Sequence, residues 1–396
     1  MRKLLLASVA AFATAGTAIA QEDGAKLGIL FGFTGPIESM AANMGPGAEL
    51  AVQEVNDSGL FLGGAPVTSV RADDACVDNA LATASAERLI TAEGVDVLIG
   101  ASCSGVTGAV LQNVAIPNGM VMISPSATSP ALSTVEDNDL FFRTSPSDAR
   151  QGEVMAQILT ERGIDEVALT YTNNDYGKGL ADAFQSSFEA LGGTVTISAA
   201  HEDGKADYSA EVGALAAAGG DVLVVAGYAD QGGSGIVRSA LDTGAFDTFH
   251  FPDGMISSAL TDNFGDSIDG STGQHPATDS PGAQQLADLA AAAGFDATSP
   301  YARESYDAAA LALLAMQAAG SADPADYGPR VMDVANAPGE QIFPGELAKG
   351  LQILQDGGDI DYVGASDVEL IGGGESAGSY REVILENGEL STVGFR

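Results

Sequence analysis

The chain has no tryptophan, only two cysteines and three histidines, and far fewer basic than acidic residues. Lysine and arginine together number 16, against 54 aspartates and glutamates, so the formal net charge is −38 at pH 7. A surface this acidic repels polyanions, which excludes nucleic acid and anionic membrane surfaces as partners. We interpret the acidity as a means of keeping an abundant protein soluble rather than as the mark of a cationic ligand.

The scarcity of histidine argues against catalysis and against a metal centre. His201, His250 and His275 are scattered, show no ligand spacing near the cysteines and lack the Ser or Cys neighbours of a nucleophile and base pair. The sequence also contains no nucleophile elbow, phosphate-binding loop or dinucleotide fingerprint. We therefore expect a protein that is not an enzyme and that needs neither a cofactor nor a metal ion.

Long apolar runs are absent except near the amino end. Arg2-Lys3 precede the apolar stretch Leu4–Ala15, and the small residues Ala18-Ile19-Ala20 follow it. This layout is typical of a secretory signal peptide over residues 1–20, so the exported protein is predicted to begin at Gln21 in the periplasm. The alternative is a membrane anchor, but Ala, Thr and Gly dilute the stretch, which falls short of the roughly 20 residues a spanning helix needs.

About 375 residues remain after that cleavage, which is more than one hydrophobic core usually serves. Strand-like and helix-like segments alternate throughout, a pattern typical of parallel sheets covered by helices on both faces. The predicted strands are 27–33, 67–70, 95–100 and 120–123 in a first series and 166–171, 194–198 and 222–226 in a second. The predicted helices are 48–55, 83–92 and 105–114, then 151–161, 179–190, 209–217 and 236–241.

The two series predict an α/β protein with two doubly wound parallel-sheet lobes joined by three hinge crossings. The crossings are expected near residues 141–146, 273–276 and 372–374, the last before a terminal strand over 380–385. Helices near 284–293 and 301–318 would return to the first lobe. The first lobe would then hold 21–146 plus 277–371, and the second 147–276 plus 372–396.

The cysteines follow two strands of the first lobe. Cys76 and Cys103 would both reach an oxidising compartment, and each lies just after a predicted strand on the same side of the lobe. A disulfide is favoured over two free thiols, because the two residues are placed near each other.

Ligands of doubly wound sheets bind beyond the carboxyl ends of the strands, so the loops there hold the candidate site. Ser104 is expected as the N-cap of the helix after strand 95–100, where free backbone N–H groups suit a carboxylate. In the loop 124–130, Thr128 can donate to a carboxylate and the Ala127 carbonyl can accept from an ammonium. An ordinary helix cap and a plain turn are the simpler alternatives for these two segments.

The second series offers aromatic and acidic side chains in equivalent loops. Tyr176 and Tyr228 follow two strand ends and could close over a small ligand, although each alone fits core packing equally well. Asp253 follows the strand-like segment 249–252 and could pair with an ammonium, although an Asp followed by Gly254 is commonly just a turn.

Several of these motifs together carry a family resemblance. The matching runs are Gly35-Pro36, Gly47-Ala48-Glu49-Leu50-Ala51-Val52, Asp73-Asp74-Ala75-Cys76, Ser102-Cys103-Ser104, Ile123-Ser124-Pro125-Ser126-Ala127-Thr128, Asp175-Tyr176-Gly177-Lys178-Gly179, Gly227-Tyr228 and Tyr306-Asp307-Ala308. Because these runs occur in this order, the sequence resembles the leucine/isoleucine/valine-binding proteins of ABC importers over essentially the whole exported chain. That family has the type I periplasmic binding fold, and its members capture small amino acids.

The resemblance assigns roles to the candidate residues. The residue matching Ser104 binds the ligand carboxylate, that matching Thr128 contacts both carboxylate and ammonium, and that matching Ala127 lies in the same backbone ring. The tyrosines matching Tyr176 and Tyr228 clamp the ligand from the second lobe.

Two positions depart from the family pattern. Asp253 stands where amino-acid-binding members commonly have Glu, and Met40 stands where leucine-binding members have an aromatic residue. Glu38 could read a polar or cationic side chain, but a solvated loop acid is the favoured interpretation. The paired cysteines of the family align with Cys76 and Cys103, which strengthens the predicted disulfide.

We therefore expect a periplasmic solute-binding protein of an ABC importer that captures a branched-chain or related amino acid by hinge closure. It would act as a monomer and deliver its ligand to a permease in the inner membrane. The alternatives are a binding protein for urea, short amides or another small polar solute, and a ligand-sensing receptor domain. Retention of Ser104, Thr128 and Asp253 disfavours an uncharged ligand, and a receptor would carry a membrane or signalling segment, which we do not find up to Arg396.

Overall fold

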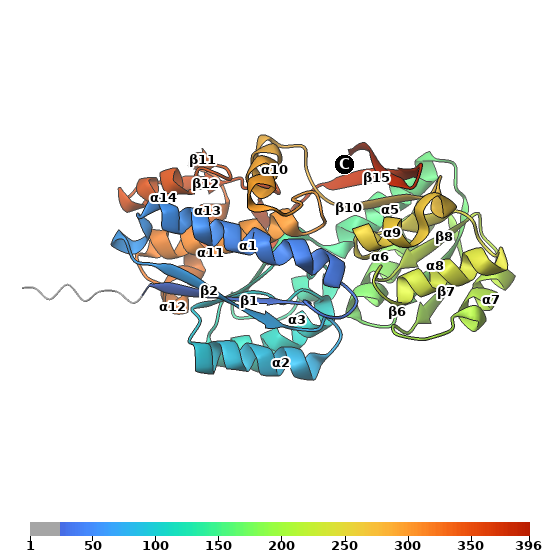
Figure 1. Ribbon diagram of the computed structural model, residues 1–396, viewed down its shortest axis with the longest axis horizontal. Coiled ribbons are helices and arrows are strands. Elements are labelled where there is room, and N and C mark those ends of the chain that lie inside the picture. The colour runs from blue at the N-terminus through green and yellow to red at the C-terminus, as the bar shows by residue number, and fades with distance from the viewer. Residues whose placement is uncertain (1–23) are drawn as a thin grey trace, which may run out of the picture.

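The computed structural model describes residues 24–396, which form two α/β lobes lying end to end along the long axis of the molecule (Figure 1). The predicted signal peptide over 1–20 lies outside the described residues. Each lobe is built on a seven-stranded, mostly parallel sheet, as the alternating pattern predicts. Within the described part of the chain, no helix has both the length and the apolar character needed to cross a bilayer.

The first sheet has the strand order β13-β14-β5-β4-β3-β1-β2. Its strands are β1 (Ala25–Phe31), β2 (Val67–Asp73), β3 (Val97–Gly100), β4 (Met122–Ser124), β5 (Phe141–Pro146), β13 (Leu370–Ile371) and β14 (Glu375–Ser376). The helices of this lobe are α1 (Glu38–Ser58), α2 (Asn79–Arg88), α3 (Ser104–Val110), α4 (Ile116–Asn118), α10 (Pro281–Ala293), α11 (Ala302–Ala319), α12 (Pro324–Tyr327), α13 (Val331–Ala335) and α14 (Leu347–Gln355). A small sheet of β11 (Glu340–Ile342) and β12 (Ile360–Tyr362) completes it. Helices α1 and α11 cover one face of the large sheet and α2 and α3 the other (Figure 1).

The second sheet has the order β16-β15-β10-β9-β8-β6-β7. Its strands are β6 (Glu166–Thr172), β7 (Thr194–His201), β8 (Val222–Ala226), β9 (Phe249–Phe251), β10 (Thr272–Pro276), β15 (Tyr380–Glu386) and β16 (Glu389–Phe395). Its helices are α5 (Asp148–Glu161), α6 (Asp175–Ala190), α7 (Ser209–Ala218), α8 (Gly232–Thr243) and α9 (Ser258–Phe264). Strand β15 pairs antiparallel with both β10 and β16, whereas the other neighbours run parallel.

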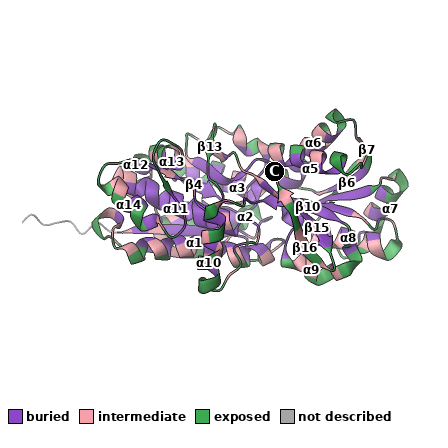
Figure 2. Ribbon diagram, turned by 90° about the horizontal axis from the view of Figure 1, so that it is seen from above, coloured by how far each residue is buried: buried purple, intermediate pink, exposed green. Residues whose placement is uncertain are grey.

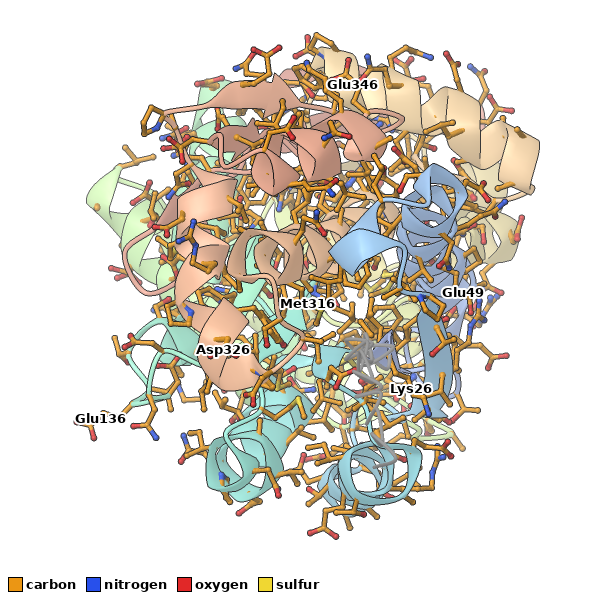
Figure 3. The ribbon with its side chains drawn as sticks, turned by 90° about the vertical axis from the view of Figure 1, so that its left-hand side faces the viewer. Lys26, Glu49, Glu136, Met316, Asp326 and Glu346 are labelled. Carbon is orange, nitrogen blue, oxygen red and sulfur yellow. A yellow bond between two sulfur atoms is a disulfide. The ribbon has the colours of Figure 1, made fainter. Side chains whose placement is uncertain are left out.

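The apolar core follows from the central strands. All residues of β3 and β8 are buried, as expected for parallel strands covered on both faces. Figure 2 shows buried residues gathered in the interior of each lobe and exposed residues on the outer surfaces of the helices. Helix α11 is buried along almost its whole length because its many alanines let neighbouring elements approach closely. Many acidic side chains lie outside this core: Figure 3 shows Glu136, Asp326 and Glu346 at the periphery of the first lobe, with Met316 inside.

Two of the elements that differ from the sequence prediction, α1 and β16, do so for local reasons. Helix α1 begins at Glu38, not near residue 48, and continues through Pro46, although Gly45-Pro46-Gly47 looks like a helix break. Gly47 is needed there, because a Cβ at this position would lie 2.5 Å from the Ala302 carbonyl oxygen of α11. The hairpin partner β16 was not predicted, although Asn387-Gly388, both with positive φ, is the turn that joins it to β15.

The chain passes between the two sheets after Pro146, Pro276 and Ser376. The third passage comes a few residues later than the crossing predicted at 372–374, because β14 still pairs with β5 of the first sheet. The second and third connections touch each other, since Ala277 N donates to the Ser379 carbonyl oxygen at 3.0 Å. Three segments of chain thus connect the two lobes, two of them in direct contact.

Candidate ligand-binding site

The loop that carries Ser104 is anchored covalently and by a buried acid. Cys76 and Cys103 form the predicted disulfide. The carboxylate of Asp74 accepts hydrogen bonds from the Cys76 amide at 2.8 Å and from the Ser102 amide at 2.7 Å. Burial raises the pKa of Asp74 to about 6, against the lowering effect of these bonds. The strand-end loops after β2 and β3 are therefore held together as one rigid support.

A small cavity of ≈ 20 Å³ lies where the two lobes meet. Its walls include five of the seven predicted ligand-binding residues, Met40, Ser104, Tyr176, Tyr228 and Asp253. The other lining residues are Ile37, Ser102, Cys103, Ser126, Gly254 and Tyr301. Its free volume is close to that of one water molecule, so the side chains of the two lobes nearly fill the cleft in this arrangement.

Asp253 is the centre of the hydrogen bonding in this cavity. Its Oδ1 accepts from the Tyr176 hydroxyl at 2.8 Å and from Gln151 Nε2 at 3.0 Å, and its Oδ2 accepts from the Tyr301 hydroxyl. Burial raises the pKa of Asp253, and the three donors partly offset that rise. Tyr301 belongs to the loop before α11, so its bond to Asp253 joins the first lobe to the second.

The two predicted tyrosines form one wall of the cavity. The rings of Tyr176 and Tyr228 stack with centroids 5.2 Å apart, and both residues are buried. The Tyr228 hydroxyl accepts from Asn174 Nδ2 at 3.4 Å, while the Tyr176 hydroxyl accepts from the Gly254 amide at 3.2 Å. Both rings are thus fixed before any ligand arrives.

A second buried acid, which the sequence prediction missed, lies close to Asp253. Asp148 is the first residue of α5, and its amide donates to the Thr128 carbonyl oxygen at 2.8 Å. No hydrogen bond of ordinary geometry joins either oxygen of its carboxylate, or the Thr128 hydroxyl, to a described residue, but the Thr128 hydroxyl and the charge of Arg143 are close enough to lower its pKa in part. Burial, and then the charge of Asp253, raise the pKa of Asp148 well above its usual value.

The cation nearest these acids is already neutralised. Arg143 is buried and donates to the carbonyl oxygens of Ala127 and Ser129, both at 3.0 Å, and its other nitrogen forms a 2.5 Å salt bridge with Glu375. The Ala127 carbonyl proposed for an ammonium is therefore already in use. Ala127, Thr128 and Asp148 are not among the residues that line the cavity.

Ser104 takes a different position from the one predicted. Helix α3 begins at Ser104, its N-cap is Cys103, and no side chain caps it. The Ser104 hydroxyl instead accepts from the Ser129 amide at 3.1 Å, which ties the two first-lobe loops together. The hydroxyl hydrogen of Ser104 remains available as a donor toward the cavity.

Two aliphatic side chains contribute to the lining of the cavity. Met40, which is 2% exposed, and Ile37 both line it, whereas Glu38 is exposed and lines no part of it. The structure thus agrees with the interpretation of Glu38 as a solvated acid.

Asp148 and Tyr301 were both missed by the sequence analysis, but only one of them has a signal in the sequence. Asp148 follows the end of strand β5, so the strand-end rule applied to the other loops would have found it. Tyr301 follows no strand and adopts a left-handed conformation with φ of 67°, which nothing in the sequence announces.

The histidines take no part in this cavity. Burial lowers the pKa of His201 to about 4 and those of His250 and His275 to about 3, so all three are neutral at pH 7. The described residues contain no cluster of His, Cys, Asp and Glu that could hold a metal ion.

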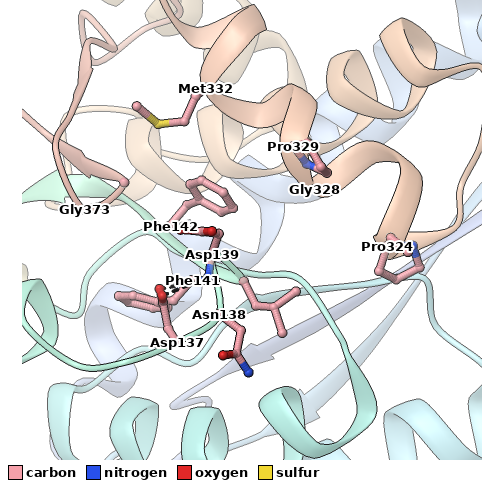
Figure 4. A pocket seen from close by; sticks show the side chains of 13 residues that line it. Asp137, Asn138, Asp139, Phe141, Phe142, Pro324, Gly328, Pro329, Met332 and Gly373 are labelled. Atoms are coloured by element: carbon pink, nitrogen blue, oxygen red, sulfur yellow. Dashed lines mark hydrogen bonds between the residues drawn. The ribbon is translucent and has the colours of Figure 1, made fainter.

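A larger cavity of ≈ 570 Å³ lies elsewhere in the first lobe (Figure 4). It is formed by the loop before β5, including Asp137 and Asn138, and by the segment from Pro324 to Met332. It lies at the amino end of β5, whereas the conserved geometry of doubly wound sheets places ligands at the carboxyl ends. We assign it no role in ligand capture.

Comparison with known proteins decides the family. A profile described as periplasmic binding protein matches residues 24–331. The chain belongs to the periplasmic binding protein family. The family consists of solute-binding proteins and not of enzymes, in agreement with the sequence prediction and with the resemblance to leucine/isoleucine/valine-binding proteins.

Two curated relatives and one solved structure illustrate the similarity. The chain is 35% identical to Leu/Ile/Val-binding protein homolog 3 of Brucella melitensis over 59% of its own length, an alignment that spans 62% of that relative. It is 32% identical to the Leu/Ile/Val-binding protein BraC3 of Rhizobium johnstonii over 76% of its length and 81% of the relative. The structure of LivJ from Streptococcus pneumoniae in complex with isoleucine superposes with a TM-score of 0.78 at 21% identity, covering 94% of this chain and 99% of LivJ.

Proposed function

We propose that this periplasmic binding protein captures a small zwitterionic amino acid, branched-chain or related, between its lobes and delivers it to the permease of an ABC importer. The observation that carries the proposal is the pair of buried carboxylates, Asp148 and Asp253, beside the interlobe cavity, with no unpaired cation among the described residues around them. Buried charge without a partner is costly, so a ligand that brings an ammonium group fits this site.

The ammonium end would bind between the two acids. Asp253 already accepts three hydrogen bonds from side chains, whereas Asp148 has only the nearby Thr128 hydroxyl and no hydrogen bond of ordinary geometry. Asp148 and the Thr128 hydroxyl therefore offer the larger unused capacity for an N⁺–H donor, with Asp253 as the second negative charge. With Asp148 sharing the ammonium, its binding would not depend on Asp253 alone, whose side chain is shorter than the Glu common at this position in amino-acid-binding members.

The carboxylate end would bind to the first lobe. Ser104 can donate its hydroxyl hydrogen, and the adjacent start of α3 supplies backbone N–H groups and a partial positive charge. Ser102 and Ser126 border the same space, and the Ser126 hydroxyl is already bonded to the Ser102 carbonyl oxygen at 2.8 Å. The carboxylate end of the ligand would thus meet the first lobe, and the ammonium end the two acids of the second lobe.

The aliphatic side chain would lie against Ile37, Met40, Tyr228 and Tyr301. These residues offer apolar atoms and aromatic faces, and Met40 can adapt its shape to side chains of different branching. The names of the Brucella and Rhizobium relatives, and the isoleucine bound to LivJ, support a branched-chain preference.

Capture would proceed by rotation of the lobes about the three connecting segments. We infer that the lobes divide as predicted, except that residues 372–376 move with the first. The ligand would bind first to the Ser104 side, and Tyr176, Tyr228 and Asp253 would then close over it. Export by the signal peptide, with cleavage after Ala20, would place the protein in the periplasm, where it would act as a monomer.

A ligand without charge is the competing proposal for this cavity. Urea or a short amide would leave both acids without a cation, at a large desolvation cost. A melting-temperature screen of residues 21–396 against amino acids, urea, short amides and polyamines separates the two, since a ligand specific to the native state raises the melting temperature. Stabilisation by branched-chain amino acids supports the proposal, and stabilisation by urea or amides alone overturns it.

A further inference from the structure

The first turn of α1 forms part of the interlobe cavity. Ile37 is the N-cap of this 21-residue helix, and Met40 belongs to its first turn. Both side chains line the cavity and both are buried. Any contact that fixes this turn in place therefore also fixes two of the residues proposed to meet the side chain of the ligand.

Helix α1 has no cap from its own segment. An N-cap side chain normally accepts a hydrogen bond from the amide two or three positions further on, but Ile37 has no polar side-chain atom and forms no such bond. The Glu38 amide finds an acceptor in the Gly35 carbonyl oxygen at 3.4 Å. The Met40 amide donates to the Ile37 carbonyl oxygen at 3.0 Å. The Ser39 amide between them has no acceptor among the described residues of the first lobe.

The acceptor for the Ser39 amide comes from the second lobe. Oδ2 of Asp230 accepts from this amide at 2.9 Å, although the two residues are 191 positions apart in the sequence. The second helical amide is the one that a capping Asp commonly binds, so Asp230 takes the place of the missing cap. Its carboxylate also faces the positive end of the helix dipole, which adds to the attraction.

Asp230 forms no other polar contact that would explain its position. It has no salt bridge with any described residue, and the bond to the α1 amide is the one hydrogen bond that the structure shows for its carboxylate. The turn that carries it belongs to the second-lobe wall of the cavity, since Tyr228 lies two residues earlier and lines the cavity. The Ala229 amide fixes this turn by donating to the Gly254 carbonyl oxygen at 3.0 Å.

The bond between Ser39 and Asp230 requires the closed arrangement of the lobes. The two residues belong to different lobes, so rotation about the connecting segments separates them. Water would then solvate both groups, and closure restores the helix cap. Loss of a helix cap changes an equilibrium by a factor of about 5, which is the scale on which Asp230 can favour closure.

We propose that Asp230 is a positioning residue for the amino-acid site, a role that rests on the function proposed above. Asp230 caps α1 from the opposite lobe and so favours closure over the bound ligand, without lining the cavity itself. A ligand that binds the closed form gains affinity in proportion to the population of that form. Asp230 should therefore strengthen the binding of every amino acid that the site accepts by the same factor.

Calorimetric titration of residues 21–396 with leucine, isoleucine and valine tests this role. Asp230→Ala should weaken the binding of each amino acid that the parent binds by about fivefold, the loss expected for a helix cap. Asp230→Asn should stay within about twofold of the parent, because an Asn oxygen can accept from the same amide and Asn caps helices as well as Asp does. Asp323→Ala is the matched control and should keep the parental affinity, since Asp323 caps α12 within one lobe by accepting from the Ala325 amide at 2.9 Å.

Hydrogen exchange supplies a readout that a change in overall stability does not reproduce. With the amino acid at saturation, the Ser39 amide should exchange roughly fivefold faster in Asp230→Ala than in the parent or in Asp230→Asn, because its acceptor is lost. Parental affinity or parental exchange in Asp230→Ala, or an equal loss in Asp230→Asn, overturns the role of Asp230 and leaves the proposed function intact. Failure of the parent to bind any amino acid instead removes the proposed function, and the role of Asp230 with it.

Discussion

The hydroxyl of Tyr301 donates to Oδ2 of Asp253 and joins the loop before α11 in the first lobe to the end of β9 in the second. A second bond, from the Ser39 amide to Asp230 at 2.9 Å, crosses the same gap. Together they hold the lobes around a cavity of only ≈ 20 Å³. Tyr301 thus occupies part of the space, and part of the acceptor capacity, that an amino acid would use.

Removing this bond should shift the lobes apart. Tyr301→Phe keeps the ring but loses the hydrogen bond to a buried acid, which contributes about 1–3 kcal/mol. We expect the ligand-free variant to show a larger radius of gyration by small-angle X-ray scattering. Tyr327→Phe is the matched control, because its buried hydroxyl bonds to the Asp96 carbonyl oxygen within one lobe. Unchanged scattering in Tyr301→Phe would show that the bond does not hold the lobes.

The two acids should contribute unequally to amino-acid binding. Asp148→Asn removes the carboxylate that has no hydrogen bond of ordinary geometry, and Asp253→Ala removes one already shared by three donors. Each should weaken binding more than tenfold, since loss of a buried charge partner costs about 2–5 kcal/mol, and we expect the larger effect at Asp148. Calorimetry measures both, with exposed Asp182→Asn as the control. Parental affinity in either variant removes that residue from the site.

Binding should release protons at pH values below the raised pKa values of the two acids. The pKa values of Asp148 and Asp253 are raised in the ligand-free protein, chiefly by burial, and a bound ammonium would lower them again. Affinity should therefore fall as pH drops from neutral through the raised pKa values toward the ordinary aspartate value of 3.8. Calorimetric titrations in buffers of different ionisation enthalpy measure how many protons are released when the amino acid binds. Asp148→Asn should reduce the release, and an affinity independent of pH between 4 and 7 would refute the coupling.

The disulfide should stabilise the first lobe. Cys76 and Cys103 close a loop of 27 residues, for which chain entropy predicts about 2–4 kcal/mol. Urea unfolding of the Cys76→Ser, Cys103→Ser double variant measures this directly, and reductant should lower the stability of the parent but not of the variant. Because the bridge supports the Ser104 loop, amino-acid affinity should fall as well. A parent insensitive to reductant would contradict this role.

Much of this arrangement could be predicted from the sequence because the local signals agreed. The buried strands β3 and β8 read as apolar runs, and the strand-end rule brought Ser104, Tyr176, Tyr228 and Asp253 to one place. The start of α1 could not be predicted in this way. The helix continues through Pro46 because Gly47 packs closely against Ala302 of α11, and these two residues are 255 positions apart in the sequence.

Other features depend on tertiary geometry that no single segment carries. Tyr301 reaches the cavity only through a left-handed residue in an irregular loop. The Ala127 carbonyl looked free for a ligand until the structure placed Arg143 against it. The lack of a hydrogen bond of ordinary geometry at Asp148 likewise becomes visible only when all its neighbours are in place.

One measurement tests the central claim most directly: calorimetric titration of residues 21–396 with leucine, isoleucine and valine, alongside 4-methylpentanoate and leucinamide. The first analogue is leucine without its ammonium group, and the second is leucine with its carboxylate made neutral. We predict that at least one of the three amino acids binds and that both analogues bind at least tenfold more weakly, because Asp148 and Asp253 need the cation and Ser104 the anion. Binding of 4-methylpentanoate as tight as that of leucine, or no binding of any of the three amino acids, would contradict the account.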